Sequence, residues 1–407
     1  MINFLAFWAF QFLIFSFFSP LSCVCTWLIS LLSALVWYSF YRLLFRFKFK
    51  FYYSWIIWEF VKDRFFGGLP WGDLYSFVGG FFPCNQLFHW ISPYLISLLL
   101  LAIIREGIIG LIRRDRLRLF VVLLAFLFWA GVGYLSFVVE RGHYHERQVL
   151  GKKLNVCVFQ TGIKALDKQR VELAPIIWEK YLAFLKNRIT GSDLLVFPET
   201  MAIYSWPNRE LIHYIDRLEN MLGKNFIILG VNLCSNGQFY NSALLVKPEG
   251  FSIYAKQKLV PFGEYLPDWI PNGVKNNILR LIPLLRNAQY SRGKDNVVFR
   301  VKGINVMPLI CYEDSFYYLI ETRMKKIRQE IHALVVLSND DWFGKGLAQW
   351  FHLNMARIAA IRFSVWVIKA NNDGFSCIID PMGRIVAGDI NWDNLGKRTL
   401  VCGIIKI

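Results

Sequence analysis

The chain has 407 residues, of which 55% are hydrophobic and only 18% are charged, with 36 phenylalanines and 15 tryptophans. This composition is too apolar for an ordinary soluble protein and indicates membrane-spanning segments. The net charge is +17, which could point to nucleic acid, but no nucleic-acid-binding motif accompanies it. We therefore expect no nucleic-acid partner and interpret the positive charge as attraction to anionic phospholipid headgroups.

The long uncharged runs are concentrated in the first 139 residues. With roughly 20 residues needed for each span, this region predicts about five transmembrane helices. They lie near residues 2–18, 21–45, 51–66, 87–104 and 118–139. Basic residues cluster at 42–50 and at 113–118, and such clusters stay on the cytoplasmic side of a membrane. Five spans with both clusters inside place the N-terminus in the cytoplasm and everything after about residue 140 outside it.

From residue 154 onward, short β-rich runs alternate with helical stretches. This alternation predicts an α/β layered domain. The predicted strands are 154–160, 193–197, 225–231, 241–247, 304–310, 333–338, 366–370 and 376–380. The predicted helices lie near 166–188, 207–222, 315–330 and 348–362. A polar stretch separates the two parts, so we expect a transmembrane helical domain at 1–140 and a catalytic domain at 150–407.

Three reactive side chains stand beside apolar, strand-like runs: Glu199, Lys256 and Cys311. A carboxylate, an ammonium and a thiol are the parts of an acyl-transfer site, because the thiol needs a base to become a thiolate and the oxyanion needs a cation. Each residue also has an ordinary interpretation. A lone glutamate is more often a helix cap or an ion-pair partner, and a lone cysteine is more often a buried hydrophobe. Spacing alone does not choose between Lys256 and Lys258.

Several motifs in chain order carry a resemblance to a known family. They are Phe-Pro-Glu at 197–199, Lys-x-x-Leu-Val-Pro-Phe-Gly-Glu-Tyr at 256–265, Ile-Cys-Tyr-Glu at 310–313 and Ser-Asn-Asp-Asp-Trp-Phe-Gly at 338–344. Further matching stretches lie at 58–62, 66–71, 350–357 and 371–374. Together they resemble the apolipoprotein N-acyltransferases, which are membrane-bound members of the nitrilase superfamily.

The resemblance implies a fold and a set of site residues. The fold would be a layered αββα nitrilase-like domain on an N-terminal transmembrane helical bundle. Glu199 would be the general base, Lys256, rather than Lys258, the oxyanion stabiliser, and Cys311 the nucleophile. Supporting positions near the site would be Glu264, Tyr312 and Glu313. The chain departs from the family at 167–169, where Asp-Lys-Gln stands in place of an expected tryptophan.

The resemblance also implies a reaction and a location. A fatty acyl chain would pass from a phospholipid, through a cysteine thioester, to the N-terminal α-amine of a diacylglyceryl-cysteine apolipoprotein. This is the last step of bacterial lipoprotein maturation. Phospholipid would be the acyl donor and the apolipoprotein the acceptor. The enzyme would be a multi-pass protein of the bacterial cytoplasmic (inner) membrane, with its catalytic domain on the periplasmic side.

Two other functions compete with acyl transfer: a membrane-tethered nitrilase-type amidase, in which water takes the acyl group, and a membrane scaffold with a degenerate nitrilase domain. No cofactor and no metal are expected. His143, His145 and Glu146 lack further ligands nearby, and the eight cysteines show no metal-binding spacing. If the second domain lies outside the cytoplasm, its cysteines could form one or two disulfides.

Overall fold

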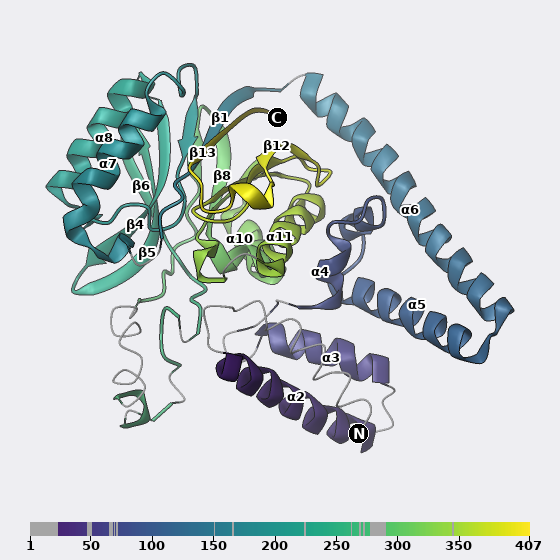
Figure 1. Ribbon diagram of the computed structural model, residues 1–407. Coiled ribbons are helices and arrows are strands. Elements are labelled where there is room, and N and C mark those ends of the chain that lie inside the picture. Colours follow the sequence, from purple (N-terminus) through teal and green to yellow (C-terminus); the bar gives the residue numbers. More distant parts are fainter. Residues whose placement is uncertain are drawn as a thin grey trace. The chain divides into compact units, whose positions relative to one another are not determined.

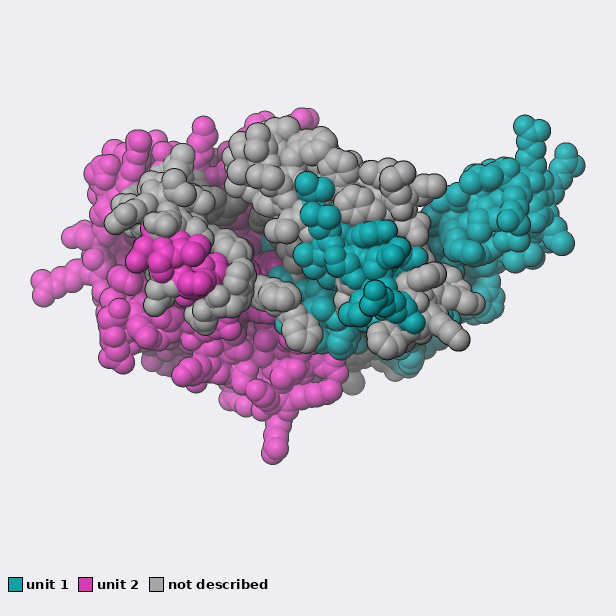
Figure 2. Space-filling model, turned by 90° about the horizontal axis from the view of Figure 1, so that it is seen from below, with its two compact units in different colours: residues 1–147, 343–364, 381–383 teal, residues 148–342, 365–380, 384–407 magenta. Residues whose placement is uncertain are grey.

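The computed structural model is drawn in Figure 1. It describes residues 23–46, 51–64, 68, 70, 72–149, 151–164, 167–223, 225–261, 263–267, 270, 271, 273–276, 290–343 and 346–407. The chain divides into two compact units, which Figure 2 shows in different colours. Unit 1 consists of residues 1–147, 343–364 and 381–383, and unit 2 of residues 148–342, 365–380 and 384–407.

Unit 1 is helical in its described part. Its elements are α2 (Cys23–Arg46), α3 (Phe51–Arg64), α4 (Leu74–Val78), the 3-10 helix η1 (Cys84–His89), α5 (Pro93–Arg113), α6 (Arg116–Val149) and α11 (Leu347–Phe363). The predicted span at 21–45 falls on α2, and those at 87–104 and 118–139 overlap α5 and α6. The predicted span at 2–18 lies outside the described residues.

Two of the described helices, α5 and α6, are long and apolar enough to cross a membrane, over Pro93–Arg113 and Arg116–Tyr144. Length and composition alone support this assignment. Both helices expose large apolar side chains, among them Ile112 on α5 and Phe128 on α6, which are 77% and 74% exposed. Extended apolar surface of this kind marks a contact with lipid or with another protein.

The predicted span at 51–66 falls on α3, which is only 14 residues long. At 1.5 Å per residue such a helix covers about 21 Å, less than the roughly 30 Å hydrocarbon core of a bilayer. Its polar side chains are used inside unit 1. Glu59 accepts a hydrogen bond from the backbone N–H of Leu74 at 2.8 Å, and Lys62 pairs with Asp73 at 2.6 Å. These contacts fasten α3 to the start of α4.

Helix α11 packs against α4 and η1, although it lies far from them in sequence. The side-chain amide of Asn354 donates a hydrogen bond to the carbonyl oxygen of Ser76 at 3.2 Å. A Cβ on Gly79 would lie 2.9 Å from the carbonyl oxygen of Asn354, so this close approach requires glycine. The compact units therefore differ from the predicted domains, because the segment 343–364 groups with the N-terminal helices.

The described part of unit 2 contains two β-sheets. The first has the strand order β13-β1-β2-β4-β5-β6, with β3 paired to β4. Its strands are β1 (Lys153–Gln160), β2 (Leu194–Val196), β3 (Ser205–Trp206), β4 (Phe226–Ser235), β5 (Gln238–Lys247), β6 (Gly250–Ala255) and β13 (Thr399–Lys406). β1, β2 and β4 are parallel. β13 runs antiparallel to β1, and a disulfide between Cys157 and Cys402 joins these two strands.

The second sheet has the strand order β12-β11-β10-β9-β8-β7. Its strands are β7 (Phe299–Val301), β8 (Ile304–Ile310), β9 (Ala333–Ser338), β10 (Trp366–Asn371), β11 (Ser376–Ile379) and β12 (Ile385–Asp389). β8, β9 and β10 are parallel. Pro308 is tolerated within β8 because β7 pairs only with Ile304–Val306, so no strand on that side needs a hydrogen bond from position 308.

Helices and sheets of unit 2 form layers. Helices α7 (Ala174–Leu185) and α8 (Arg209–Leu222) cover the first sheet through a large buried cluster that includes Trp178 and Phe197. The second sheet packs on the first through contacts of β1 with β10 and of β5 with β8, and Figure 1 shows α7 and α8 outside the sheets. The remaining described helices are η2 (Asp167–Gln169), η3 (Val171–Leu173), η5 (Cys311–Ser315), α10 (Tyr317–Ile327), η6 (Asp340–Phe343) and η7 (Trp392–Asn394). The predicted α/β class is confirmed for this unit.

Candidate functional site

Glu199 lies just beyond the carboxyl end of β2, a strand of the first sheet, where α/β domains place functional groups. The residue is only 7% exposed. One carboxylate oxygen, Oε1, accepts a hydrogen bond from the side-chain amide of Asn241 at 2.6 Å and lies 3.4 Å from Nζ of Lys256. The carboxylate predicted from the sequence is therefore buried beside an ammonium group.

Lys256 follows β6 directly, and its Nζ is enclosed by carboxylates. It lies 3.0 Å from Glu264 and 3.4 Å from Glu199. Lys258 points elsewhere: its Nζ donates to the hydroxyl of Tyr318 at 3.1 Å. The two lysines therefore differ in environment although they are only two residues apart. The ammonium of Lys256 is buried between two carboxylates, whereas Lys258 contacts α10. Of the two lysines, Lys256 is thus the one whose ammonium adjoins Glu199.

Cys311 is the first residue of η5, the 3-10 turn that directly follows β8. Its backbone φ is +49°, in the left-handed region that costs a non-glycine residue roughly 1 kcal/mol or more. The residue is 7% exposed. Electrostatic effects from Glu199, Lys256 and Asp340 reach the thiol, as does a hydrogen bond with Ser338 at the end of β9. The three predicted reactive residues are therefore brought together from three separate strand ends.

Glu313 is fully buried and fastens the Cys311 turn to the Lys256 segment. Its Oε2 accepts the backbone N–H of Ile310 at 2.9 Å, one residue before the thiol. Its Oε1 accepts the backbone N–H groups of Gln257 and Lys258 at 2.7 and 3.0 Å. A single carboxylate thus fixes the chain on both sides of the site.

Two further buried groups adjoin the turn. The Asp340 carboxylate accepts hydrogen bonds from the hydroxyl of Ser338 at 3.0 Å and from the side-chain amide of Asn371 at 2.6 Å. Asp314, three residues beyond the thiol, pairs with Lys369 of β10 at 2.9 Å, and both side chains are almost inaccessible to solvent. The motifs at 338–344 and 371–374 therefore contribute to the support of the Cys311 turn.

Burial and charge set the protonation of the site. Burial and the nearby carboxylate of Glu199 raise the pKa of the Cys311 thiol well above its usual value, against the opposite effect of Lys256. Burial also raises the pKa of Glu199, an effect that Lys256 opposes and Glu264 reinforces. Burial alone lowers the pKa of Lys256, but Glu264 and Glu199 overcome this effect and hold it well above its usual value. The resting thiol is protonated, so attack requires transfer of its proton to a base.

Two residues at this site were not among the predicted site residues. The side-chain amide of Asn241, in β5, donates hydrogen bonds to Glu199 at 2.6 Å and to Glu264 at 2.7 Å, and so links the two carboxylates. Lys168 of η2 donates from Nζ to the backbone carbonyl of Glu199 at 3.2 Å. Tyr312, predicted to support the site, packs its ring edge-to-face on Phe316 at 4.8 Å between centroids.

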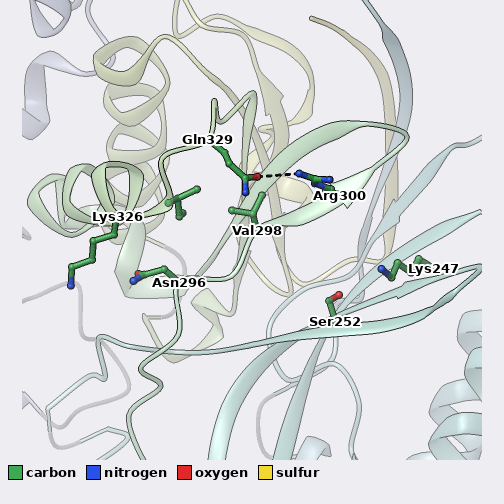
Figure 3. A pocket seen from close by; sticks show the side chains of 8 residues that line it. Lys247, Ser252, Asn296, Val298, Arg300, Lys326 and Gln329 are labelled. Atoms are coloured by element: carbon green, nitrogen blue, oxygen red, sulfur yellow. Dashed lines mark hydrogen bonds between the residues drawn. The ribbon is translucent and has the colours of Figure 1, made fainter.

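A cavity of about 410 Å³ on unit 2 lies apart from these residues. It is lined by basic side chains, Lys247, Arg300 and Lys326, and by none of the predicted site residues (Figure 3). Gln329 faces Arg300 across part of it, at 3.5 Å. The candidate site is therefore the buried cluster around Cys311 and not this open cavity.

Comparison with known proteins identifies relatives over most of the chain. This chain is 26% identical over 345 residues to an apolipoprotein N-acyltransferase from Wigglesworthia glossinidia brevipalpis. The match covers 82% of this chain and 64% of the relative. It is 27% identical over 353 residues to one from Pseudomonas paraeruginosa, covering 82% and 63%. The chain thus spans slightly less than two thirds of the length of these relatives. The expected resemblance to apolipoprotein N-acyltransferases is confirmed.

A solved structure of a CN-hydrolase superfamily protein from Xanthomonas campestris has a TM-score of 0.46 and 17% identity, and the match covers 63% of this chain and 91% of that one. The family model for carbon-nitrogen hydrolases matches residues 156–403, which is more than half of the chain and includes all of the predicted site residues. The chain therefore belongs to the carbon-nitrogen hydrolase family.

Proposed function

We propose that this protein transfers a fatty acyl chain from a phospholipid to the N-terminal α-amine of a diacylglyceryl-cysteine apolipoprotein, through a thioester on Cys311. The observation that carries the proposal is that the thiol of Cys311, the ammonium of Lys256 and the carboxylate of Glu199 form a buried cluster at the ends of separate strands. The names of the relatives supply the substrate classes. Glu199 acts as general base, Lys256 as oxyanion stabiliser and Cys311 as nucleophile.

In the first half-reaction, Glu199 takes the proton of the Cys311 thiol while the sulfur attacks the ester carbonyl of the phospholipid. A C–S bond forms, and the carbonyl oxygen becomes an oxyanion that Lys256 stabilises. When this intermediate collapses, the ester C–O bond breaks and the proton on Glu199 passes to the departing oxygen. The products are an acyl thioester and a lysophospholipid.

In the second half-reaction, the neutral α-amine of the apolipoprotein attacks the thioester carbonyl. Glu199 takes a proton from the attacking nitrogen and returns it to the sulfur of Cys311 when the C–S bond breaks. An amide forms and the free thiol is regenerated. Cys311 and Glu199 are each only 7% exposed, and this burial limits competing attack by water.

Product analysis tests the proposal against hydrolysis. The purified protein is incubated with a phospholipid and a synthetic diacylglyceryl-cysteine peptide, and the lipids and peptide are measured by mass spectrometry. Acyl transfer gives equal amounts of lysophospholipid and N-acylated peptide. Free fatty acid with an unmodified peptide would indicate that water is the acceptor, as in the amidase alternative. The Cys311→Ser variant is the matched control.

For location, we propose that the helices of unit 1 anchor the protein in the bacterial cytoplasmic membrane as a multi-pass bundle, with unit 2 on the periplasmic side. The apolar helices α5 and α6 support membrane anchoring. The disulfide between Cys157 and Cys402 supports the periplasmic side, because disulfides persist in oxidising compartments. Phospholipid and lipoprotein would then share one face of the membrane with the thiol.

A further inference from the structure

Lys168 makes a contact that the proposed mechanism does not use. It lies in the short helix η2, between β1 and α7, and its Nζ donates a hydrogen bond to the main-chain carbonyl oxygen of Glu199 at 3.2 Å. The carboxylates of Glu199 and of Asp341, in η6, also act on its charge. A lysine from the start of unit 2 thus contacts the backbone of the candidate base.

The backbone at Glu199 needs such support. On one side it packs against β4: a Cβ on Gly230 would lie 2.5 Å from the carbonyl oxygen of Pro198 and 2.6 Å from Cα of Glu199. The N–H of Gly230 donates to the carbonyl of Pro198 at 3.2 Å. On the other side, Thr200 has a φ of +44°, which is unfavourable for a β-branched residue. The peptide that joins Glu199 to Thr200 is therefore held in an unfavourable conformation.

We infer that Lys168 is a positioning residue for Glu199: its ammonium anchors the Glu199 carbonyl and so holds the carboxylate against Lys256 and toward Cys311. This inference rests on the proposed role of Glu199 as base. Lys168 binds the carbonyl of Glu199 and Gly230 binds the carbonyl of Pro198, so the Glu199 side chain leaves a backbone whose two adjacent carbonyls are both held. The positive charge also favours the ionised carboxylate, which is the form that accepts the thiol proton.

The charge of Lys168 is sensitive to pH. Burial lowers the pKa of its ammonium to about 8, although the carboxylates of Glu199 and Asp341 act in the opposite direction. The ammonium is therefore intact below about pH 8 and is lost as the pH rises above it. A guanidinium keeps its charge throughout this range. A Lys168→Arg variant therefore separates the charge from a purely structural contribution of the side chain.

The test measures how fast iodoacetamide alkylates Cys311 in the full-length protein, by peptide mass spectrometry between pH 6 and pH 9.5. This reaction needs no acyl donor, and the exposed free thiol of Cys234 serves as an internal reference. The variants are Lys168→Met and Lys168→Arg, with Lys164→Met as the matched control, because Lys164 is exposed and lies four residues earlier. Each variant is also combined with Glu199→Gln.

Below pH 8, Lys168→Met should slow alkylation of Cys311 about tenfold, the effect of one charge-assisted hydrogen bond, while Lys164→Met and Lys168→Arg match the wild type. Above pH 8, Lys168→Arg should react faster than the wild type. In the Glu199→Gln background, Lys168→Met should have no further effect, because it acts through Glu199. Any of three results would overturn the inference. Lys168→Met and Lys164→Met could be alkylated at equal rates, or the ratio of the Lys168→Arg rate to the wild-type rate could stay constant with pH. The third is that the effects of Lys168→Met and Glu199→Gln on the rate are additive.

The same variants are then incubated with phospholipid, and acyl-cysteine formation is followed by intact mass. This arm separates the two proposals. If the wild type forms no acyl adduct but the alkylation pattern holds, the acyltransferase proposal fails and the role of Lys168 stands. If the adduct forms equally fast in Lys168→Met and Lys164→Met, the acyltransferase proposal stands and the role of Lys168 fails.

Discussion

Replacing Glu313 with glutamine should loosen both sides of the site at once. The carboxylate accepts three backbone N–H groups, those of Ile310, Gln257 and Lys258, and the hydroxyl of Tyr254 at 2.8 Å. An amide of the same shape has only one acceptor oxygen, so its NH₂ group must face at least one of these donors. The substitution keeps the volume of the side chain, and its effect therefore reports on hydrogen bonding and charge.

The expected cost follows from this count. A buried N–H left without an acceptor costs roughly 1–3 kcal/mol. The remaining bonds change from charged to neutral acceptors, which weakens each by about 1 kcal/mol. One hydrogen bond is lost and three are weakened, so the sum is about 4–6 kcal/mol of stability in unit 2. For a domain of this size it corresponds to a fall of about 15 °C in the unfolding midpoint.

The assay combines thermal unfolding with hydrogen exchange of the amides of Ile310, Gln257 and Lys258. Exchange at these amides should accelerate by about three to four orders of magnitude, since about 1.4 kcal/mol corresponds to tenfold. Glu249→Gln is the matched control, because Glu249 is exposed in the turn between β5 and β6. An unfolding midpoint and exchange rates equal to those of the control would refute the assignment of Glu313 as the link between the two segments.

Three other predictions address charge, covalent structure and topology. Lys256→Met should reduce the rate of acyl transfer by roughly two to three orders of magnitude. Lys258→Met should retain most of the rate, because the Nζ of Lys258 contacts α10. Equal losses in the two variants would show that Lys256 does not stabilise the oxyanion. Cys402→Ser opens a disulfide that spans 245 residues and should lower stability by about 5 kcal/mol, and an unchanged unfolding midpoint under non-reducing conditions would show that the bond does not form. A reporter active only outside the cytoplasm should be active when fused after Ile407 and inactive when fused after Arg116; the reverse pattern would place unit 2 in the cytoplasm.

Activity should also fall at low pH for a defined reason. Burial raises the pKa of Glu199 above its ordinary value, and only the carboxylate can accept the thiol proton. As the pH falls through this raised pKa, the base form is lost, so the rate of acyl-enzyme formation should decline at a higher pH than an exposed glutamate would produce. A rate measured from pH 4 to pH 8 checks this, and a profile without an acid-side decline would exclude Glu199 as the base.

The central strands of unit 2 were predictable from the sequence. The predicted strands at 304–310 and 333–338 coincide with β8 and β9, because buried parallel strands form continuous apolar runs with clear ends. The strands β3, β6, β7, β12 and β13 were missed. Most of their residues are exposed or half-buried, or the strand is short, as in the three-residue β7. The pairing of β13 with β1 joins residues about 250 apart in sequence, and no local pattern contains it.

The site was predictable in part for similar reasons. Glu199, Lys256 and Cys311 each stand at a strand end, where sequence pattern and chemistry coincide. Asn241 lies inside β5, where an asparagine has no distinctive pattern, and only the fold reveals that it bridges two carboxylates. The left-handed backbone of Cys311 was also hidden, because nothing local distinguishes a cysteine at a sharp turn from one in a strand. The boundary of unit 1 depends on the packing of α11, which likewise requires the fold.

The covalent intermediate tests the central claim most directly. Wild-type protein is incubated with a phospholipid of known acyl chains, digested, and analysed by mass spectrometry at the peptide that contains Cys311. The account predicts one acyl group on Cys311, lost on treatment with hydroxylamine, and passed to the α-amine of a diacylglyceryl-cysteine peptide when that acceptor is added. The Cys311→Ser variant should carry no adduct and transfer nothing. An acylated peptide produced by Cys311→Ser, or an adduct on another residue of the wild type, would contradict the account.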